Sequence, residues 1–192
     1  MKKVKWGINK FGKMLFALTV VTFTGGLVVE AVETPIEIKL TSGGLSLGTI
    51  PNLSFEGEIG EGVYSLEDNS NLNVQVSDFR GNGAGWQLQV AMSELTYDDN
   101  GTPRTLEGAE LIFLGSGVPI GTDNYASESP AGVSNVEIVP GGAARPVMTA
   151  ANNSGMGTWG QEFNDVTLKV PNDSFIGDYT GILTWTFGDA PS

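Results

Sequence analysis

The side chains that could do chemistry in this 192-residue chain are carboxylates, because the sequence contains neither histidine nor cysteine. Ser-His-Asp and Cys-His nucleophiles, imidazole or thiolate zinc sites and disulfides are therefore excluded. Carboxylates cluster at Glu56, Glu58 and Glu61 and again at Asp98 and Asp99. A glycosidase needs two carboxylates across a cleft, and Ca²⁺ needs several oxygen ligands. Neither cluster has a recognisable catalytic or EF-hand-like spacing, so we interpret both as solvated surface and expect no catalytic residue, metal site or cofactor.

A glycine-rich run, Gly81-Asn82-Gly83-Ala84-Gly85, resembles a phosphate-binding loop only in composition. A strand pattern follows it in place of a helix, and it lacks the Lys-Ser/Thr pair of a phosphate loop. We interpret it as a tight turn or bulge that leads into the next strand.

Tryptophan side chains are the remaining candidates for a binding role. Trp86 and Trp185 each have apolar residues two positions away, which indicates packing in a core, with ligand stacking or a protein interface as the alternatives. Trp159 lies in a glycine-rich stretch without alternation. We expect its ring to be exposed and to contact a sugar or a partner; the alternative is a side chain folded back as a lid on the core. If the Trp159 ring is exposed, Trp159→Ala should weaken binding to the wall or to a partner and leave the melting temperature within a few degrees of that of the native protein.

Short alternating runs separated by Gly, Pro, Asn and Asp predict an all-β fold, a single β-sandwich or barrel-like domain with long Gly/Pro/Asn-rich loops. Each run places its apolar residues on one face of a strand. The predicted faces are Ile36/Ile38/Leu40, Leu72/Val74/Val76, Trp86/Leu88/Val90, Val166/Leu168/Val170 and Leu183/Trp185/Phe187. Residues 111–114 are apolar at every position, which favours a central strand covered on both sides.

Turn and loop signals complete this prediction. Asp99-Asn100-Gly101 predicts a hairpin turn, because Asn and Gly tolerate the positive φ that such turns require. Residues 115–132 and 140–160 are rich in small and polar residues and are predicted to be long surface loops, with a short helical turn near Ala143 and Ala144.

The first 31 residues have the pattern of a secretory signal peptide. Five lysines precede a sixteen-residue apolar stretch, 14–29, which is shorter than the roughly 20 residues that span a bilayer. We expect cleavage after Ala31; the alternative is an uncut membrane anchor. The mature chain, 32–192, would carry five basic and 21 acidic groups, a net charge of −16. That charge disfavours nucleic acid as a partner, and an exported chain without cysteine favours a Gram-positive host.

The two tryptophan-containing motifs resemble those of the WxL family of Gram-positive surface proteins. The first motif is Trp86-Gln87-Leu88, after the glycine-rich run. The second is formed by Tyr179, Leu183, Thr184 and Trp185, with Phe187 where the family usually has Leu. Residues 45–55 also resemble the family's N-terminal strands, so the likeness covers essentially the whole mature chain.

The resemblance implies a secreted, non-enzymatic protein at the cell surface that binds the Gram-positive cell wall, peptidoglycan in particular, without a covalent link. No C-terminal sorting motif is recognisable, which agrees with non-covalent attachment. The alternative is an interaction subunit of a surface complex, held at the wall through a membrane-anchored partner. The residues expected to bind the ligand or partner are Trp86, Leu88, Trp159, Tyr179, Leu183, Thr184 and Trp185.

Overall fold

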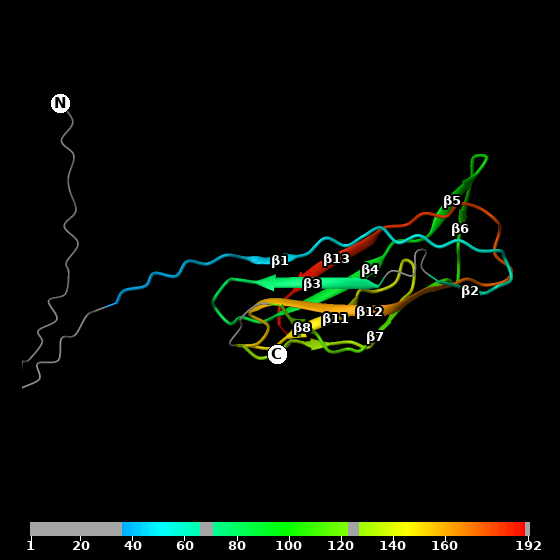
Figure 1. Ribbon diagram of the computed structural model, residues 1–192. Coiled ribbons are helices and arrows are strands. Elements are labelled where there is room, and N and C mark those ends of the chain that lie inside the picture. Colours follow the sequence, from blue (N-terminus) through cyan, green and yellow to red (C-terminus); the bar gives the residue numbers. More distant parts are fainter. Residues whose placement is uncertain (1–35, 66–70, 123–126, 191–192) are drawn as a thin grey trace, which may run out of the picture. The chain divides into compact units, whose positions relative to one another are not determined.

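The computed structural model describes residues 36–65, 71–122 and 127–190. This part of the chain consists of β-strands and connecting segments without a helix, and the strands lie in the unit Leu40–Ser192 (Figure 1). The predicted all-β fold is confirmed. No helix long and apolar enough to cross a membrane occurs in the described ranges. The predicted signal peptide, residues 1–31, lies outside them.

The described residues form three antiparallel sheets. The first sheet has the order β1-β3-β12-β7-β10, with β2 and β8 also paired to β12. The second has the order β13-β4-β11-β9, and β5 and β6 form a separate hairpin. The strands are β1 (Leu45–Leu47), β2 (Val63–Ser65), β3 (Leu72–Asp78), β4 (Trp86–Met92), β5 (Thr96–Asp99), β6 (Thr102–Thr105), β7 (Glu110–Gly115), β8 (Ile120–Gly121), β9 (Ala131–Gly132), β10 (Asn135–Ile138), β11 (Arg145–Ala150), β12 (Gly157–Lys169) and β13 (Leu183–Gly188).

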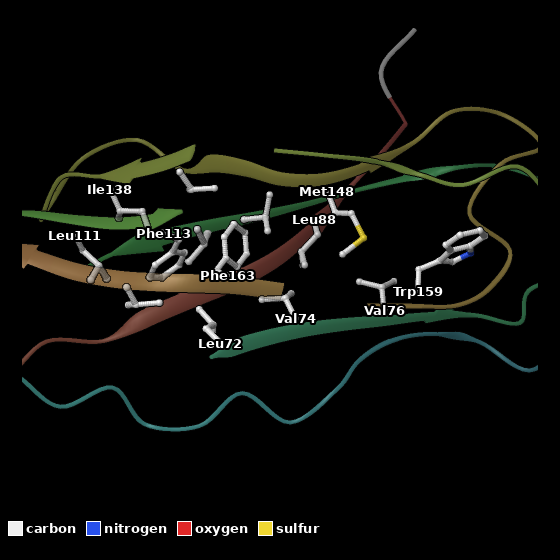
Figure 2. Packing of buried hydrophobic residues seen from close by; sticks show 14 of the residues in the cluster. Leu72, Val74, Val76, Leu88, Leu111, Phe113, Ile138, Met148, Trp159 and Phe163 are labelled. Atoms are coloured by element: carbon white, nitrogen blue, oxygen red, sulfur yellow. The ribbon is translucent and has the colours of Figure 1, made fainter. Parts of the chain in front are cut away.

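The core lies between the first and second sheets. Alternate residues of β3 and β4 are buried, as their sequence pattern predicts. They meet side chains of β7, β11 and β12 in one cluster, shown in Figure 2. Phe113 on β7 and Phe163 on β12 contact each other near its centre, with ring centroids 5.5 Å apart. Two sheets that share one apolar interior form a β-sandwich.

The hairpin and the central strand were predicted correctly. Asn100 and Gly101 have φ values of 51° and 91° and form the turn between β5 and β6. Residues 111–114 lie in β7, which pairs with β12 on one side and β10 on the other. Leu111, Ile112 and Phe113 are buried, and Leu114 is exposed.

Several expectations about the strands were wrong. Residues 36–40 form no strand, and Ile36, Ile38 and Leu40 are exposed. The predicted loop 140–160 contains all of β11 and the start of β12, and no helical turn forms near Ala143. Within 115–132 the short strands β8 and β9 interrupt the predicted loop. Val170 lies just beyond the end of β12.

Candidate functional site

The first motif belongs to the core. Trp86 on β4 has no exposed surface, and Leu88 is equally buried. The indole Nε1 of Trp86 donates a hydrogen bond to the carbonyl of Gly155 at 3.3 Å, and its ring meets Phe187 edge-on at 6.2 Å. A side chain that is buried and hydrogen-bonded in this way offers no face to a wall polymer or a partner.

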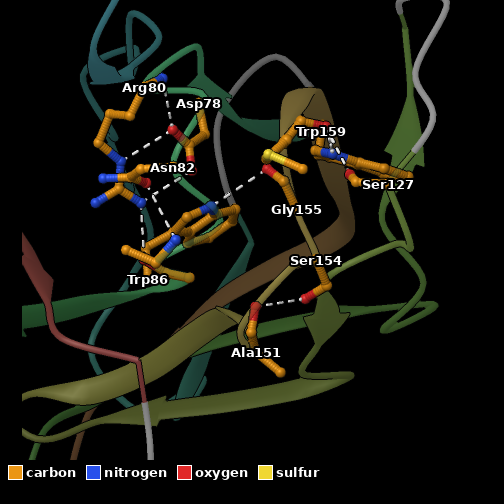
Figure 3. A network of polar contacts seen from close by, with 12 residues as sticks. Asp78, Arg80, Asn82, Trp86, Ser127, Ala151, Ser154, Gly155 and Trp159 are labelled. Carbon is orange, nitrogen blue, oxygen red and sulfur yellow. Dashed lines mark hydrogen bonds and ion pairs between the residues drawn. The ribbon is translucent and has the colours of Figure 1, made fainter. Parts of the chain in front are cut away.

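The glycine-rich run ahead of Trp86 is a turn held by an ion pair (Figure 3). Gly81, Gly83 and Gly85 all have positive φ, as the interpretation of a tight turn predicted. Arg80 donates from Nε and Nη2 to the carboxylate of Asp78, at 2.9 Å each, and Nη2 also donates to the carbonyl of Gly85 at 2.7 Å. Arg80 therefore fixes both ends of the turn and, through Gly85, the position at which β4 starts.

Asp78 should make the stability of the domain sensitive to acid. Burial raises the pKa of its carboxyl, but the hydrogen bonds and the charge of Arg80 outweigh burial and hold the pKa below its ordinary value. A lowered pKa in the folded state contributes stability above the unfolded-state pKa, and that contribution is lost as the pH falls through the folded-state value.

We expect the melting temperature of the native protein to fall more steeply below about pH 4 than that of Asp78→Asn, by a few degrees. Thermal unfolding between pH 7 and pH 2.5 measures this difference, with Asp173→Asn, an exposed carboxylate, as the control. Parallel curves for native protein and Asp78→Asn would contradict the role given to the ion pair.

Trp159 is not an exposed loop residue. It lies in β12, in register with Val76 of β3 and Gly121 of β8, and only 2% of its surface is exposed. Its Nε1 donates to the carbonyl of Met156 at 3.0 Å. Figure 2 shows the ring beside Val76 in the interior. The expectation of an exposed ring was therefore wrong, and Trp159→Ala is now expected to act on stability.

The second motif is more accessible than the first. Leu183, Trp185 and Phe187 are half-buried on one face of β13, whereas Thr184 is exposed on the other. The ring of Trp185 stacks on Phe113 of the first sheet, with centroids 6.3 Å apart and planes 7° apart. Trp185 thus joins the two sheets while keeping part of its surface in contact with solvent.

Tyr179 holds a loop in place next to this strand. Its hydroxyl donates to the carbonyl of Phe175 at 3.0 Å, and its ring meets Tyr97 of the β5–β6 hairpin edge-on at 5.4 Å. Tyr179 therefore closes the segment 175–179 on itself and packs it against the hairpin.

Tyr179, Leu183 and Trp185 line an open groove of about 880 Å³, here called the β13 groove. Most of its lining comes from the segments 50–57 and 174–182. The remaining lining is mostly apolar and comes from Ile59, Tyr64, Met92, Leu95, Leu106, Leu111, Leu168 and Val170. Three residues of the second motif thus meet at one surface depression. The other predicted binding residues Trp86, Leu88 and Trp159 do not line it.

A second feature, here called the hairpin cluster, consists of Tyr97, Asp99, Arg104, Phe175 and Tyr179. The Arg104 guanidinium lies 4.1 Å from the centroid of the Phe175 ring, and its Nη2 donates to the Asp99 carboxylate at 3.2 Å. Hydrogen bonds from Tyr97 and Arg104 hold the pKa of Asp99 below its ordinary value, so the carboxylate is charged at neutral pH. Arg104 Nε is buried and has no hydrogen-bond partner in the described part of the chain.

Sequence reasoning missed Arg104 and Phe175. Neither is in a motif, and they come together only because the hairpin packs against the segment 175–179. The turn signal at Asp99-Asn100-Gly101 predicted the hairpin itself, but no sequence signal predicted the segment that packs against it.

The acidic side chains singled out in the sequence are exposed or half-buried. Glu56 lines the β13 groove, while Glu58, Glu61 and Asp98 are exposed. Within the ranges that the structure describes, no group of three or more metal-ligating side chains lies close enough to hold an ion.

Comparison with known proteins gives one family. The family model described as "WxL domain surface cell wall-binding" matches residues 29–191. No curated protein and no solved structure matches the chain. The matched range covers every strand and both tryptophan motifs.

Proposed function

Because the chain belongs to the WxL family of surface cell wall-binding domains, a binding and not a catalytic family, we propose that the domain 32–192 of this cell-surface protein binds peptidoglycan. Residues 1–31 are removed on export, and the binding is non-covalent and involves no catalysed reaction. Wall binding and the cell-surface location follow from membership of the family. Removal of residues 1–31, peptidoglycan as the ligand and the absence of catalysis are what we propose in addition.

The hairpin cluster is the surface that we assign to the wall polymer. Partly exposed rings of Tyr97, Phe175 and Tyr179 provide faces against which the C–H face of a sugar ring packs. Arg104 provides a partly exposed guanidinium, and Asp99 provides a charged acceptor. Rings that pack beside hydrogen-bonding groups that fix orientation are the usual composition of a small-ligand site. The observation that carries the proposal is the 4.1 Å contact between Arg104 and Phe175.

Attraction between opposite charges does not explain wall binding here. The domain 32–192 has a net charge of −16, and walls that contain teichoic acids are also polyanionic. Stacking and short-range hydrogen bonds act against this repulsion only on contact, and they are little affected by screening.

We expect peptidoglycan sacculi stripped of protein to retain the domain, and Phe175→Ala to reduce the retained fraction at least about fivefold. The Phe175 side chain is 59% exposed, so its loss should leave the melting temperature within a few degrees. Co-sedimentation measures retention, and Ile120→Ala, which is exposed and lies outside both the groove and the cluster, is the control. Equal retention of all three proteins would contradict the assignment of the site.

A second candidate function has its own support. The rim of the β13 groove carries exposed apolar residues, among them Ile59, Ile176 and Ile182, which are typical of a protein interface. In that case the domain is an interaction subunit, held at the wall through a membrane-anchored partner. Stripped sacculi would then retain the domain only after the partner is added.

A further inference from the structure

We propose that the β13 groove binds an extended segment of another protein, which adds to the second sheet as a strand beside β13 and alternates apolar with basic residues. This inference goes beyond wall binding, because it concerns a different class of ligand and the open edge of β13, although Phe175 and Tyr179 of the hairpin cluster also line the groove. Three independent features of the described residues support it: an open sheet edge, an apolar groove beside that edge and the sign of the charge on the groove.

β13 is the longest edge strand that the described ranges leave open. It has six residues and pairs only with β4 among them. The other edges are shorter: β1 and β2 have three residues each, β8 and β9 have two each, and β5, β6 and β10 have four each. On β10 the carbonyl of Glu137 accepts a hydrogen bond from Arg145 Nε at 3.0 Å, which protects that edge. Every second residue of an edge strand directs its N–H and C=O groups outward, where an added strand can pair with them.

The groove beside β13 suits apolar side chains. Leu183 and Trp185 face it from the strand itself, and exposed Ile176 and Ile182 stand at its rim. A strand added along β13 would point every second side chain toward the same face as Leu183 and Trp185. Those side chains would enter the groove and cover rim residues that are now in water, which supplies the hydrophobic part of the affinity.

The charge of the groove indicates which polar residues the partner strand should carry. Its charged lining residues are Glu56 and Asp178, and no Lys or Arg contributes to the lining that the structure describes. The whole mature domain is also acidic. The polar positions of the incoming strand should therefore be Lys or Arg, because acidic residues would be repelled at close range.

Capped nine-residue peptides test this inference against residues 32–192. We expect a peptide of alternating Val and Lys to bind at least about tenfold more tightly than a peptide of the same composition in two blocks. An alternating Val and Glu peptide should bind no better than the block peptide. N-methylation of alternate backbone nitrogens, which leaves the side chains intact, should also cost at least about tenfold. Fluorescence anisotropy with labelled peptides gives the affinities.

A matched pair of variants locates the site. Ile182 at the groove rim and Ile120 on β8 are both 69% exposed. Ile182→Lys places a positive charge on the groove and should weaken binding of the alternating Val–Lys peptide, whereas Ile120→Lys should not. Equal binding by the block or N-methylated peptide, or equal effects of the two variants, would overturn the proposal. So would tighter binding of a peptide with the chain's own residues 36–40, which would make a second copy the occupant.

Retention on stripped sacculi distinguishes failure of this inference from failure of the proposed function. Ile182→Lys should be retained on stripped sacculi as well as the native domain is, because the hairpin cluster is unchanged. Displacement of the alternating peptide by soluble peptidoglycan fragments would show that the polymer occupies the groove, and it would overturn the protein-strand assignment. Phe175 lines the groove as well as the cluster, so loss of retention in Phe175→Ala with unchanged peptide binding would support separate contacts for polymer and peptide within a shared lining.

Discussion

Trp159→Ala should lower the free energy of unfolding by about 3 to 5 kcal/mol, as truncation of a large buried aromatic side chain usually does. The ring is 2% exposed and lies where β12 pairs with both β3 and β8. Removing it leaves a cavity in the core beside the start of β12 and also removes the hydrogen bond to Met156. A loss of this size is a large part of the 5 to 15 kcal/mol by which domains are typically stable.

Urea unfolding followed by tryptophan fluorescence and circular dichroism measures this loss. Val118→Ala is the control, because Val118 is an exposed aliphatic residue in a connecting segment and should change stability by less than about 0.5 kcal/mol. If Trp159→Ala stayed within about 1 kcal/mol of the native protein, the ring could not be a core residue. A Trp159→Ala protein that fails to bind sacculi would prove nothing about contact unless its folding were known.

Gly85→Ala should destabilise the domain by more than about 2 kcal/mol, through strain and steric overlap together. Gly85 has a φ of 68°, and an added Cβ would lie 2.5 Å from the carbonyl oxygen of Ala150 and 2.8 Å from that of Ala151. Both atoms belong to the backbone and can yield only if the chain shifts. Because Gly85 also accepts the hydrogen bond from Arg80, the shift would be transmitted to the turn before β4.

Gly81→Ala separates the two contributions. Gly81 has a φ of 69°, yet a Cβ there would meet nothing within 4 Å. It should therefore show backbone strain alone, about 1 kcal/mol, and Gly85→Ala should cost clearly more. Thermal and urea unfolding of both variants supply the comparison. Equal losses would mean that the close approach of Gly85 to the Ala150 backbone does not limit the fold.

The sequence predicted the strands whose burial alternates strictly. Leu72, Val74 and Val76 form one face of β3, and Trp86 and Leu88 lie on one face of β4, because a strand buried on one face repeats with a period of two. The turn at Asn100 and Gly101 was predicted because few other residues adopt its φ values.

The stretch 140–160 could not be predicted in this way. β11 includes Pro146, β12 begins with glycine, and buried Gln161 stands at a position where the pattern requires an apolar residue. Gln161 is tolerated because its Nε2 donates to the carbonyl of Val133 at 2.7 Å, a contact between distant segments. The opposite error occurred at Ile36, Ile38 and Leu40. Their alternation predicted a strand, but within the described part of the chain these residues pair with no other strand.

The candidate site was predicted in part. Tyr179, Leu183 and Trp185 of the second motif do meet at one groove, while Trp86 of the first motif is confined to the core. Their exposure depends on β13 being an edge strand, and strand order is not encoded in local periodicity. Phe175 was missed because its contact with Arg104 depends on how the hairpin packs.

Retention of the native domain 32–192 on protein-stripped sacculi at increasing salt concentration tests the central claim most directly. Stacking and short-range hydrogen bonds should hold the acidic domain equally well, or better, between about 0.05 and 1 M NaCl, because screening weakens only the repulsion. Release as the salt concentration rises would point to charge attraction. Absence from the pellet at every concentration would contradict direct binding of the polymer by this protein.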